Sequence, residues 1–216
     1  MECSSRQLFD ITLPLSEHTL VYPGDSPPII RRVSDLEQGD SLTASTFSLG
    51  CHVGTHVDAP AHFLAHGTLL EDLALECFYG PALVIRQQGK QSIEKADMEG
   101  LSIPTQHHIL LKTDNGSLLH QKTFSKEYCT LSAEAAAYLC ELNPLSIGWD
   151  YYSLDALTSP ETFPAHTVVA QANIPVFVCL NLVDIEEGSY WFSGFPLRLE
   201  GVEGAPVRAI LSRRKD

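Results

Sequence analysis

The sequence has few basic side chains for its acidic content. It contains 14 Lys and Arg against 27 Asp and Glu, which gives a formal net charge of −13 at pH 7. Nucleic-acid binding depends on clustered Lys and Arg that displace counterions from phosphates. The one basic run, residues 213–215, stands at the C-terminal end and is typical of a solvated tail. We therefore expect no nucleic-acid partner.

Long apolar runs and paired cysteines are also absent from the sequence. No apolar stretch approaches the ~18 residues of a transmembrane helix, and residues 1–6 lack the basic and apolar blocks of a signal peptide. The six cysteines form no CxxC pair, which argues against a zinc ribbon or a redox motif. We expect free thiols, no membrane partner and a cytoplasmic protein.

Helix and strand patterns are interspersed along the 216 residues, without an internal repeat or a linker. Good helix formers after a plausible N-cap at Ser132 predict a helix over 132–142, and a second helix is predicted over 164–172. Apolar or alternating runs predict strands over 9–15, 44–53, 82–86, 108–113, 145–149, 175–182, 190–199 and 206–212. Because strict βαβ alternation is missing, we predict one α/β domain over residues 1–216 with a mixed sheet.

One segment concentrates the side chains that bind metals. Three histidines and one aspartate fall within eleven residues, namely His52, His56, Asp58 and His62. Imidazole and carboxylate are the usual ligands of Zn²⁺ and Mn²⁺. Gly54, Pro60 and β-branched neighbours oppose a helix, and four extended residues would span about 13 Å, a long reach for one ion. We predict a bent loop around a metal, with structural or solvated histidines as the alternative.

The same segment resembles a family signature. Residues 52–62, HVGTHVDAPAH, are similar to the HxGTHxDxPxH signature of the cyclase-like metal hydrolases, which include bacterial kynurenine formamidase and isatin hydrolase. Supporting similarities lie at 10–15, 22–25, 148–155, 180–182 and 204–209, so the resemblance covers most of the chain. It implies the cyclase-like fold, with a mixed, partly barrel-like sheet flanked by helices, and a homodimer.

The resemblance also implies roles for individual residues. His62 would be the general acid/base, and the metal ligands would be His52, His56, Asp58 and His166, with Asp58 able to bridge two ions. Formamidase-type members carry a Glu twelve residues after the last of these histidines, where this chain has Val178. Valine cannot bind a metal. The number of ions, one or two, and their identity, Zn²⁺ or Mn²⁺, are therefore left open. Cys179 is adjacent, but strand alternation should turn it to the opposite face as a buried structural cysteine.

The implied activity is hydrolysis of a small aromatic formamide such as N-formylkynurenine by metal-activated water, as in arylformamidases. Two alternatives stay open: a cyclic amide or lactone hydrolase similar to isatin hydrolase, and a non-catalytic member that binds a small ligand or a metal. Asp150 and Asp155 would order the neighbourhood of His166, or would simply cap turns. Four aromatic residues could line a substrate pocket or pack in the core: Tyr22, Trp149, Tyr151 and Tyr152.

Overall fold

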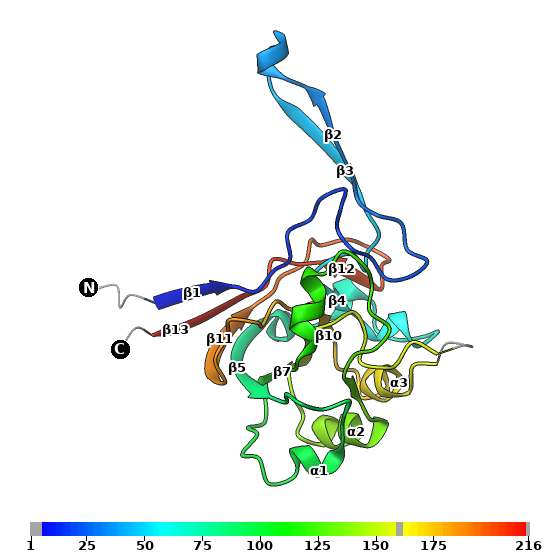
Figure 1. Ribbon diagram of the computed structural model, residues 1–216, viewed down its shortest axis with the longest axis vertical. Helices are drawn as coiled ribbons and strands as arrows, with labels where there is room; N and C mark the ends of the chain where they lie inside the picture. Colours follow the sequence, from blue (N-terminus) through cyan, green and yellow to red (C-terminus); the bar gives the residue numbers. More distant parts are fainter. Residues whose placement is uncertain (1–5, 159–161, 215–216) are drawn as a thin grey trace.

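A nine-stranded sheet runs through the computed structural model, which describes residues 6–158 and 162–214 (Figure 1). The sheet strands, in chain order, are β1 (Arg6–Asp10), β4 (His56–Asp58), β5 (Tyr79–Arg86), β7 (His108–Lys112), β9 (Ser146–Trp149), β10 (Val176–Val178), β11 (Gly188–Ser193), β12 (Gly204–Pro206) and β13 (Ile210–Arg214). Their spatial order is β1-β13-β11-β5-β7-β9-β10-β4-β12. The four central strands from β5 to β10 are parallel and the outer pairs are antiparallel. The predicted mixed α/β sheet is therefore confirmed.

Few helices accompany this sheet. The α-helices are α1 (Lys95–Met98), α2 (Ala133–Glu141) and α3 (Pro164–Gln171), and the short 3₁₀ turns are Leu36–Gln38, Pro60–His62, Leu70–Asp72, Leu75–Phe78 and Asn115–His120. Both predicted helices are confirmed, and the Ser132 hydroxyl caps α2 by accepting the Ala135 N–H at 3.2 Å. No helix in the two described ranges combines the length and apolar character needed to cross a membrane.

Both faces of the central strands are buried, and two core clusters lie on them. Along β7, Ile109 and Leu111 belong to the cluster that also contains Leu139 of α2 and Val169 of α3, whereas Leu110 belongs to the other cluster. Helices α2 and α3 therefore cover one face, as Figure 1 shows. This two-sided burial explains why the parallel strands read as continuous apolar runs rather than as alternating patterns.

The expectation for residues 44–53 was wrong in part. β3 (Ala44–Ser48) pairs with β2 (Ile29–Ser34) in a separate hairpin that projects from the body (Figure 1). Phe47, an apolar residue of that alternating run, is 67% exposed. A two-stranded hairpin outside the body has no buried face, so apolar alternation does not specify burial here. A second short pair joins β6 (Ser92–Ile93) to β8 (Thr130–Leu131).

Thr55 ties three distant segments together at the start of β4. Its hydroxyl accepts the Leu13 N–H at 2.9 Å and donates to the Cys179 carbonyl at 2.7 Å. Its own carbonyl accepts the Val207 N–H at 3.0 Å. Because Thr55 is buried, each of these backbone groups would otherwise lack a partner away from water. The histidine-rich segment is thus anchored on both sides of β4, next to the ends of β10 and β12.

We expect Thr55→Val to lower the free energy of unfolding by about 1–3 kcal/mol. The substitution leaves the buried Leu13 N–H and the buried Cys179 carbonyl without their hydrogen-bond partner. Urea denaturation measures the loss. Thr46→Val, on the exposed hairpin, is the matched control and should change stability by less than about 0.5 kcal/mol. Equal stability of the two variants would contradict the anchoring role of Thr55.

Candidate metal centre

A bend and a short strand together shape the histidine-rich segment. Gly54 has a positive φ of 65°, a conformation that suits glycine, so the predicted bend is present. The remainder is not a loop, because His56 and Asp58 lie on strand β4. Side chains two apart on a strand share a face. The strand therefore aligns His56 with Asp58, while the bend returns His52 to the same place and the 3₁₀ turn Pro60–His62 follows.

His52, His56 and Asp58 form a group that could hold a metal ion, with one ligand atom from each lying within 4.8 Å of the others. The Asp58 Oδ1 atom lies 2.7 Å from His52 Nδ1 and 3.2 Å from His56 Nε2. The two imidazole rings stand at 81° to each other, so their in-plane lone pairs can converge. Two imidazoles and a carboxylate are a donor set that suits Zn²⁺ or Mn²⁺.

The charge on Asp58 also favours a cation at this place. Burial would raise the pKa of Asp58, but His56 and His52 beside it hold that pKa well below its usual range. Burial likewise opposes protonation of His52, yet its contacts with Asp58 and Glu203 raise the pKa of His52 to about 9. Without a metal, a proton on His52 therefore balances the buried Asp58 anion. A divalent cation would replace that proton.

Hydrogen bonds orient the other imidazoles. His56 Nδ1 donates to the Gly54 carbonyl at 2.8 Å, which leaves Nε2 free to face Asp58. His166 Nδ1 donates to Asp155 Oδ2 at 2.7 Å, and Asp155 also accepts the His166 N–H at the start of α3. The expected ordering of His166 by Asp155 is therefore confirmed. Asp150 contributes nothing to it, since its carboxylate accepts instead from the backbone and hydroxyl of Thr113.

A second group that could hold a metal contains His52, His62 and Glu203. The rings of His52 and His62 are stacked, with centroids 3.8 Å apart and 19° between their planes. Desolvation lowers the pKa of His62 and the nearby imidazoles add to this, although Asp58 opposes it. The sequence reasoning missed Glu203, which lies 151 residues from His52 in the chain. Only its place before the Gly204–Pro206 block could have drawn attention to it.

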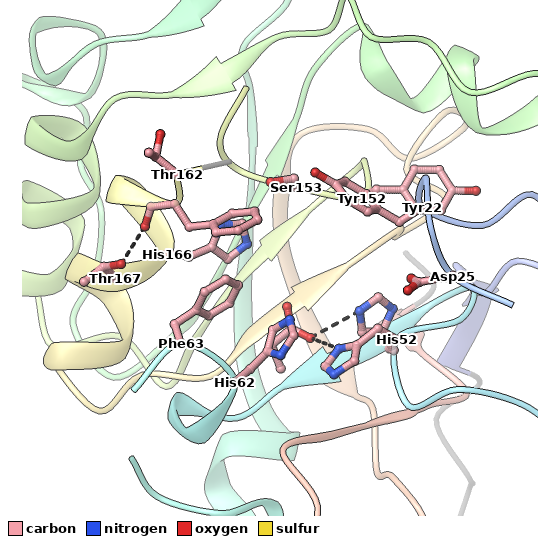
Figure 2. Close-up of a pocket in the computed structure, with 13 residues that line it drawn as sticks. Tyr22, Asp25, His52, His62, Phe63, Tyr152, Ser153, Thr162, His166 and Thr167 are labelled. Carbon is pink, nitrogen blue, oxygen red and sulfur yellow. Dashed lines mark hydrogen bonds and ion pairs between the residues drawn. The ribbon is translucent and has the colours of Figure 1, made fainter. Parts of the chain in front are cut away.

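The three histidines and Asp58 of residues 52–62 face a cavity of about 520 Å³. It is lined by Tyr22, Asp25, His52, His56, Asp58, His62, Phe63, Tyr152, Ser153, Thr162, Phe163, His166 and Thr167. Figure 2 shows His52 and His62 on one side, with Phe63 and His166 farther along. Two of the four aromatics considered from the sequence, Tyr22 and Tyr152, face this cavity, whereas Trp149 and Tyr151 are fully buried in the core.

His166 stands apart from the other predicted ligands. The Phe63 ring lies 4.4 Å from both His62 and His166, between centroids. Within the described part of the chain, His166 belongs to no group that could hold a metal. The structure thus gathers four of the five predicted site residues at one end of the cavity and places the fifth behind an apolar ring.

Val178 occupies a place on the site's own face of the sheet. It is paired with His56 across β10 and β4, and directly opposed residues put their side chains on the same face. Cys179, expected to face away, packs in the same core cluster as Val178. The strand ends at Val178, and Cys179 has a positive φ of 55°, which breaks the alternation. Burial raises the pKa of its thiol well above the usual value.

Known proteins resemble this chain in sequence and in fold. The Cyclase family model, described as "Putative cyclase", matches residues 9–156. The kynurenine formamidase of Geobacillus thermodenitrificans (strain NG80-2) is 31% identical over 204 residues, covering 94% of this chain and 96% of that protein. The structure of a potential metal-dependent hydrolase with cyclase activity superposes with a TM-score of 0.83 at 27% identity, covering 98% of this chain and all (100%) of that one. Isatin hydrolase A from Ralstonia solanacearum superposes with a TM-score of 0.83 at 26% identity, covering 96% and 92% of the two chains. The chain therefore belongs to the Cyclase family, with the cyclase-like fold that residues 52–62 predict.

Proposed function

We propose that this protein is a metal-dependent amidohydrolase of the arylformamidase type, which cleaves a small aromatic formamide such as N-formylkynurenine. The observation that carries the proposal is the convergence of His52, His56 and Asp58 at an aromatic-lined cavity. Identity of 31% to a kynurenine formamidase over 94% of the chain supports the same substrate class.

The proposed metal ligands are His52, His56 and Asp58, which would hold one Zn²⁺ or Mn²⁺ ion. His166 is the remaining candidate ligand, but it is separated from the group by Phe63. Val178, which faces the site beside His56, has no atom that could bind a second ion. We therefore assign one ion to this site. In this assignment His166 faces the substrate rather than the metal.

A divalent ion held in this way supplies an activated water and polarises the scissile carbonyl. The remaining work falls to the chain. His62 is exposed to the cavity, and its lowered pKa keeps it neutral near pH 7, so it can accept a proton from the attacking water and return it to the leaving amine. Phe63, Phe163, Tyr22 and Tyr152 line the space where an aromatic ring would bind.

A second candidate function is hydrolysis of a cyclic amide or lactone. The likeness to isatin hydrolase A from Ralstonia solanacearum, at 26% identity over 96% of this chain, supports it. So does Val178, which stands where the resemblance to formamidase-type members implies a Glu. Both reactions place a carbonyl beside an activated water, so the cavity's shape must separate them.

We also propose a cytoplasmic homodimer in which the β2–β3 hairpin contacts a second copy. The hairpin projects from the body (Figure 1). Six large apolar side chains between its first and last strand residues are exposed, namely Ile29, Ile30, Val33, Leu36, Leu42 and Phe47. An apolar arm of this kind is costly to leave in water, and an exposed apolar patch commonly marks a protein interface.

The activity test compares metal-stripped protein with protein reloaded with Zn²⁺ or Mn²⁺, using N-formylkynurenine and isatin as parallel substrates. We expect turnover of N-formylkynurenine to appear only after reloading. Turnover of isatin alone would replace the first substrate class with the second. Metal uptake without hydrolysis of either compound would contradict the amidohydrolase proposal for these substrates.

Alanine variants separate metal binding from proton transfer. We expect His52→Ala to lower metal content and activity together, because it removes a ligand. We expect His62→Ala to keep the metal but to reduce turnover by about 100-fold or more, since general acid–base groups contribute that much. Metal content is measured by elemental analysis and turnover by steady-state kinetics. Loss of metal from His62→Ala would show that the two roles are wrongly divided.

The hairpin predicts the oligomeric state. We expect Phe47→Asp to convert the dimer to a monomer, because a carboxylate cannot be buried unpaired in an apolar interface. Light scattering after gel filtration measures the mass. Leu75→Asp is the matched control, since Leu75 is 69% exposed against 67% for Phe47 but lies outside the hairpin. A monomeric wild type, or dissociation of both variants, would contradict an interface at the hairpin.

A further inference from the structure

Beyond the ligands themselves, we infer that Glu203 is a positioning residue that selects which nitrogen of His52 meets the metal. The inference rests on the metal site of the proposed function. His52 is held at both nitrogens: Nδ1 lies 2.7 Å from Asp58 Oδ1, and Nε2 lies 3.0 Å from Glu203 Oε1. An ionised carboxylate only accepts hydrogen bonds. Glu203 therefore holds a hydrogen on Nε2, so Nδ1, beside Asp58, is the nitrogen whose lone pair a metal would take in place of a proton.

That lone pair points into the proposed site. Nδ1 is the atom of His52 that approaches Asp58, and Asp58 in turn approaches His56 Nε2. In His56 the available lone pair is on Nε2 instead, because the Nδ1 hydrogen is donated to the Gly54 carbonyl. Ligating histidines generally donate their second ring N–H to an acceptor in this way. Glu203 is the acceptor for His52.

Direct metal binding by Glu203 is the competing assignment, because His52, His62 and Glu203 also lie close enough to share an ion. The ring geometry decides against it. Lone pairs of imidazole lie in the ring plane, and the stacked rings of His52 and His62 differ by only 19° at a separation of 3.8 Å. Their lone pairs therefore lie in two nearly parallel planes and do not converge on one point. The rings of His52 and His56, at 81°, can converge on one ion.

The backbone around Glu203 is fitted to the His52 ring. Its carbonyl accepts the Ala59 N–H at 2.8 Å, and the next residue, Gly204, pairs with Asp58 across β12 and β4. A Cβ atom at Gly204 would lie 2.8 Å from His52 Cε1 and 2.7 Å from the Val57 carbonyl oxygen. Glycine thus leaves room for the ring, while the Glu203 side chain reaches its outer nitrogen. Gly204 begins β12, beside β4, and Glu203 immediately precedes that strand.

The test measures Zn²⁺ affinity of the full chain by competition with a chelator, for the wild type, Glu203→Ala and Glu203→Gln. We expect Glu203→Ala to weaken binding by about 10- to 100-fold, as loss of such a partner does. Glu203→Gln keeps an acceptor oxygen and should recover part of the loss. Glu200→Gln, an exposed neighbour on the same segment, is the control and should bind Zn²⁺ as the wild type does.

A second readout follows the His52 ring itself by ¹⁵N NMR of the Zn²⁺-loaded protein. We expect hydrogen on Nε2 and metal on Nδ1 in the wild type, and loss of the protected Nε2 hydrogen in Glu203→Ala. Unchanged affinity and ring signals in that variant would overturn the inference while leaving the metal site intact. Loss of Zn²⁺ as complete as in His52→Ala would make Glu203 a ligand and also overturn it. A wild type that binds no Zn²⁺ would defeat the metal site together with the inference.

Discussion

The buried carboxylate of Asp58 is the constraint on which the site depends. An isolated anion away from water is very costly, so it must be paired or must bind a cation. Its side chain is 6% exposed, and both His52 and His56 approach the same oxygen. Contacts with Asp58 and with Glu203 raise the pKa of His52 to about 9, although burial opposes this. The same requirement makes a divalent cation the natural occupant, because it neutralises Asp58 and uses both imidazole lone pairs.

The pairing of strand β4 with its two neighbours determines which residues lie beside His56 and Asp58. The strand lies between β10 and β12 in the sheet, so every side chain on the site's face has a neighbour set by register. On one side the register brings Val178 opposite His56, and on the other it brings Gly204 opposite Asp58. The first neighbour removes a possible ligand for a second ion, and the second makes room for the His52 ring. Strand pairing therefore decides which side chains stand beside His56 and Asp58.

The cavity is lined by the polar site residues and by aromatic side chains. The rings of His52, His62, Phe63 and His166 follow one another with centroid separations of 3.8 Å, 4.4 Å and 4.4 Å. An aromatic substrate would thus find stacking surfaces close to the reacting carbonyl. His166, held by Asp155 at the start of α3, remains available to the substrate side of the cavity. This arrangement suits small planar amides and does not by itself distinguish open from cyclic ones.

The sequence by itself determined the fold class, helices α2 and α3 and the family, because helix formers, apolar strands and the spacing of residues 52–62 are local patterns. It also singled out His52, His56, Asp58 and His62, whose chemistry is unusual at such close spacing. Only the tertiary structure decided that Phe47 is exposed, that Asp155 rather than Asp150 orients His166, and that Glu203 reaches His52 from 151 residues away. Those outcomes depend on which strands pair and in which register. Strand pairing joins segments that are far apart in the chain, and the local sequence of one segment does not specify its partner.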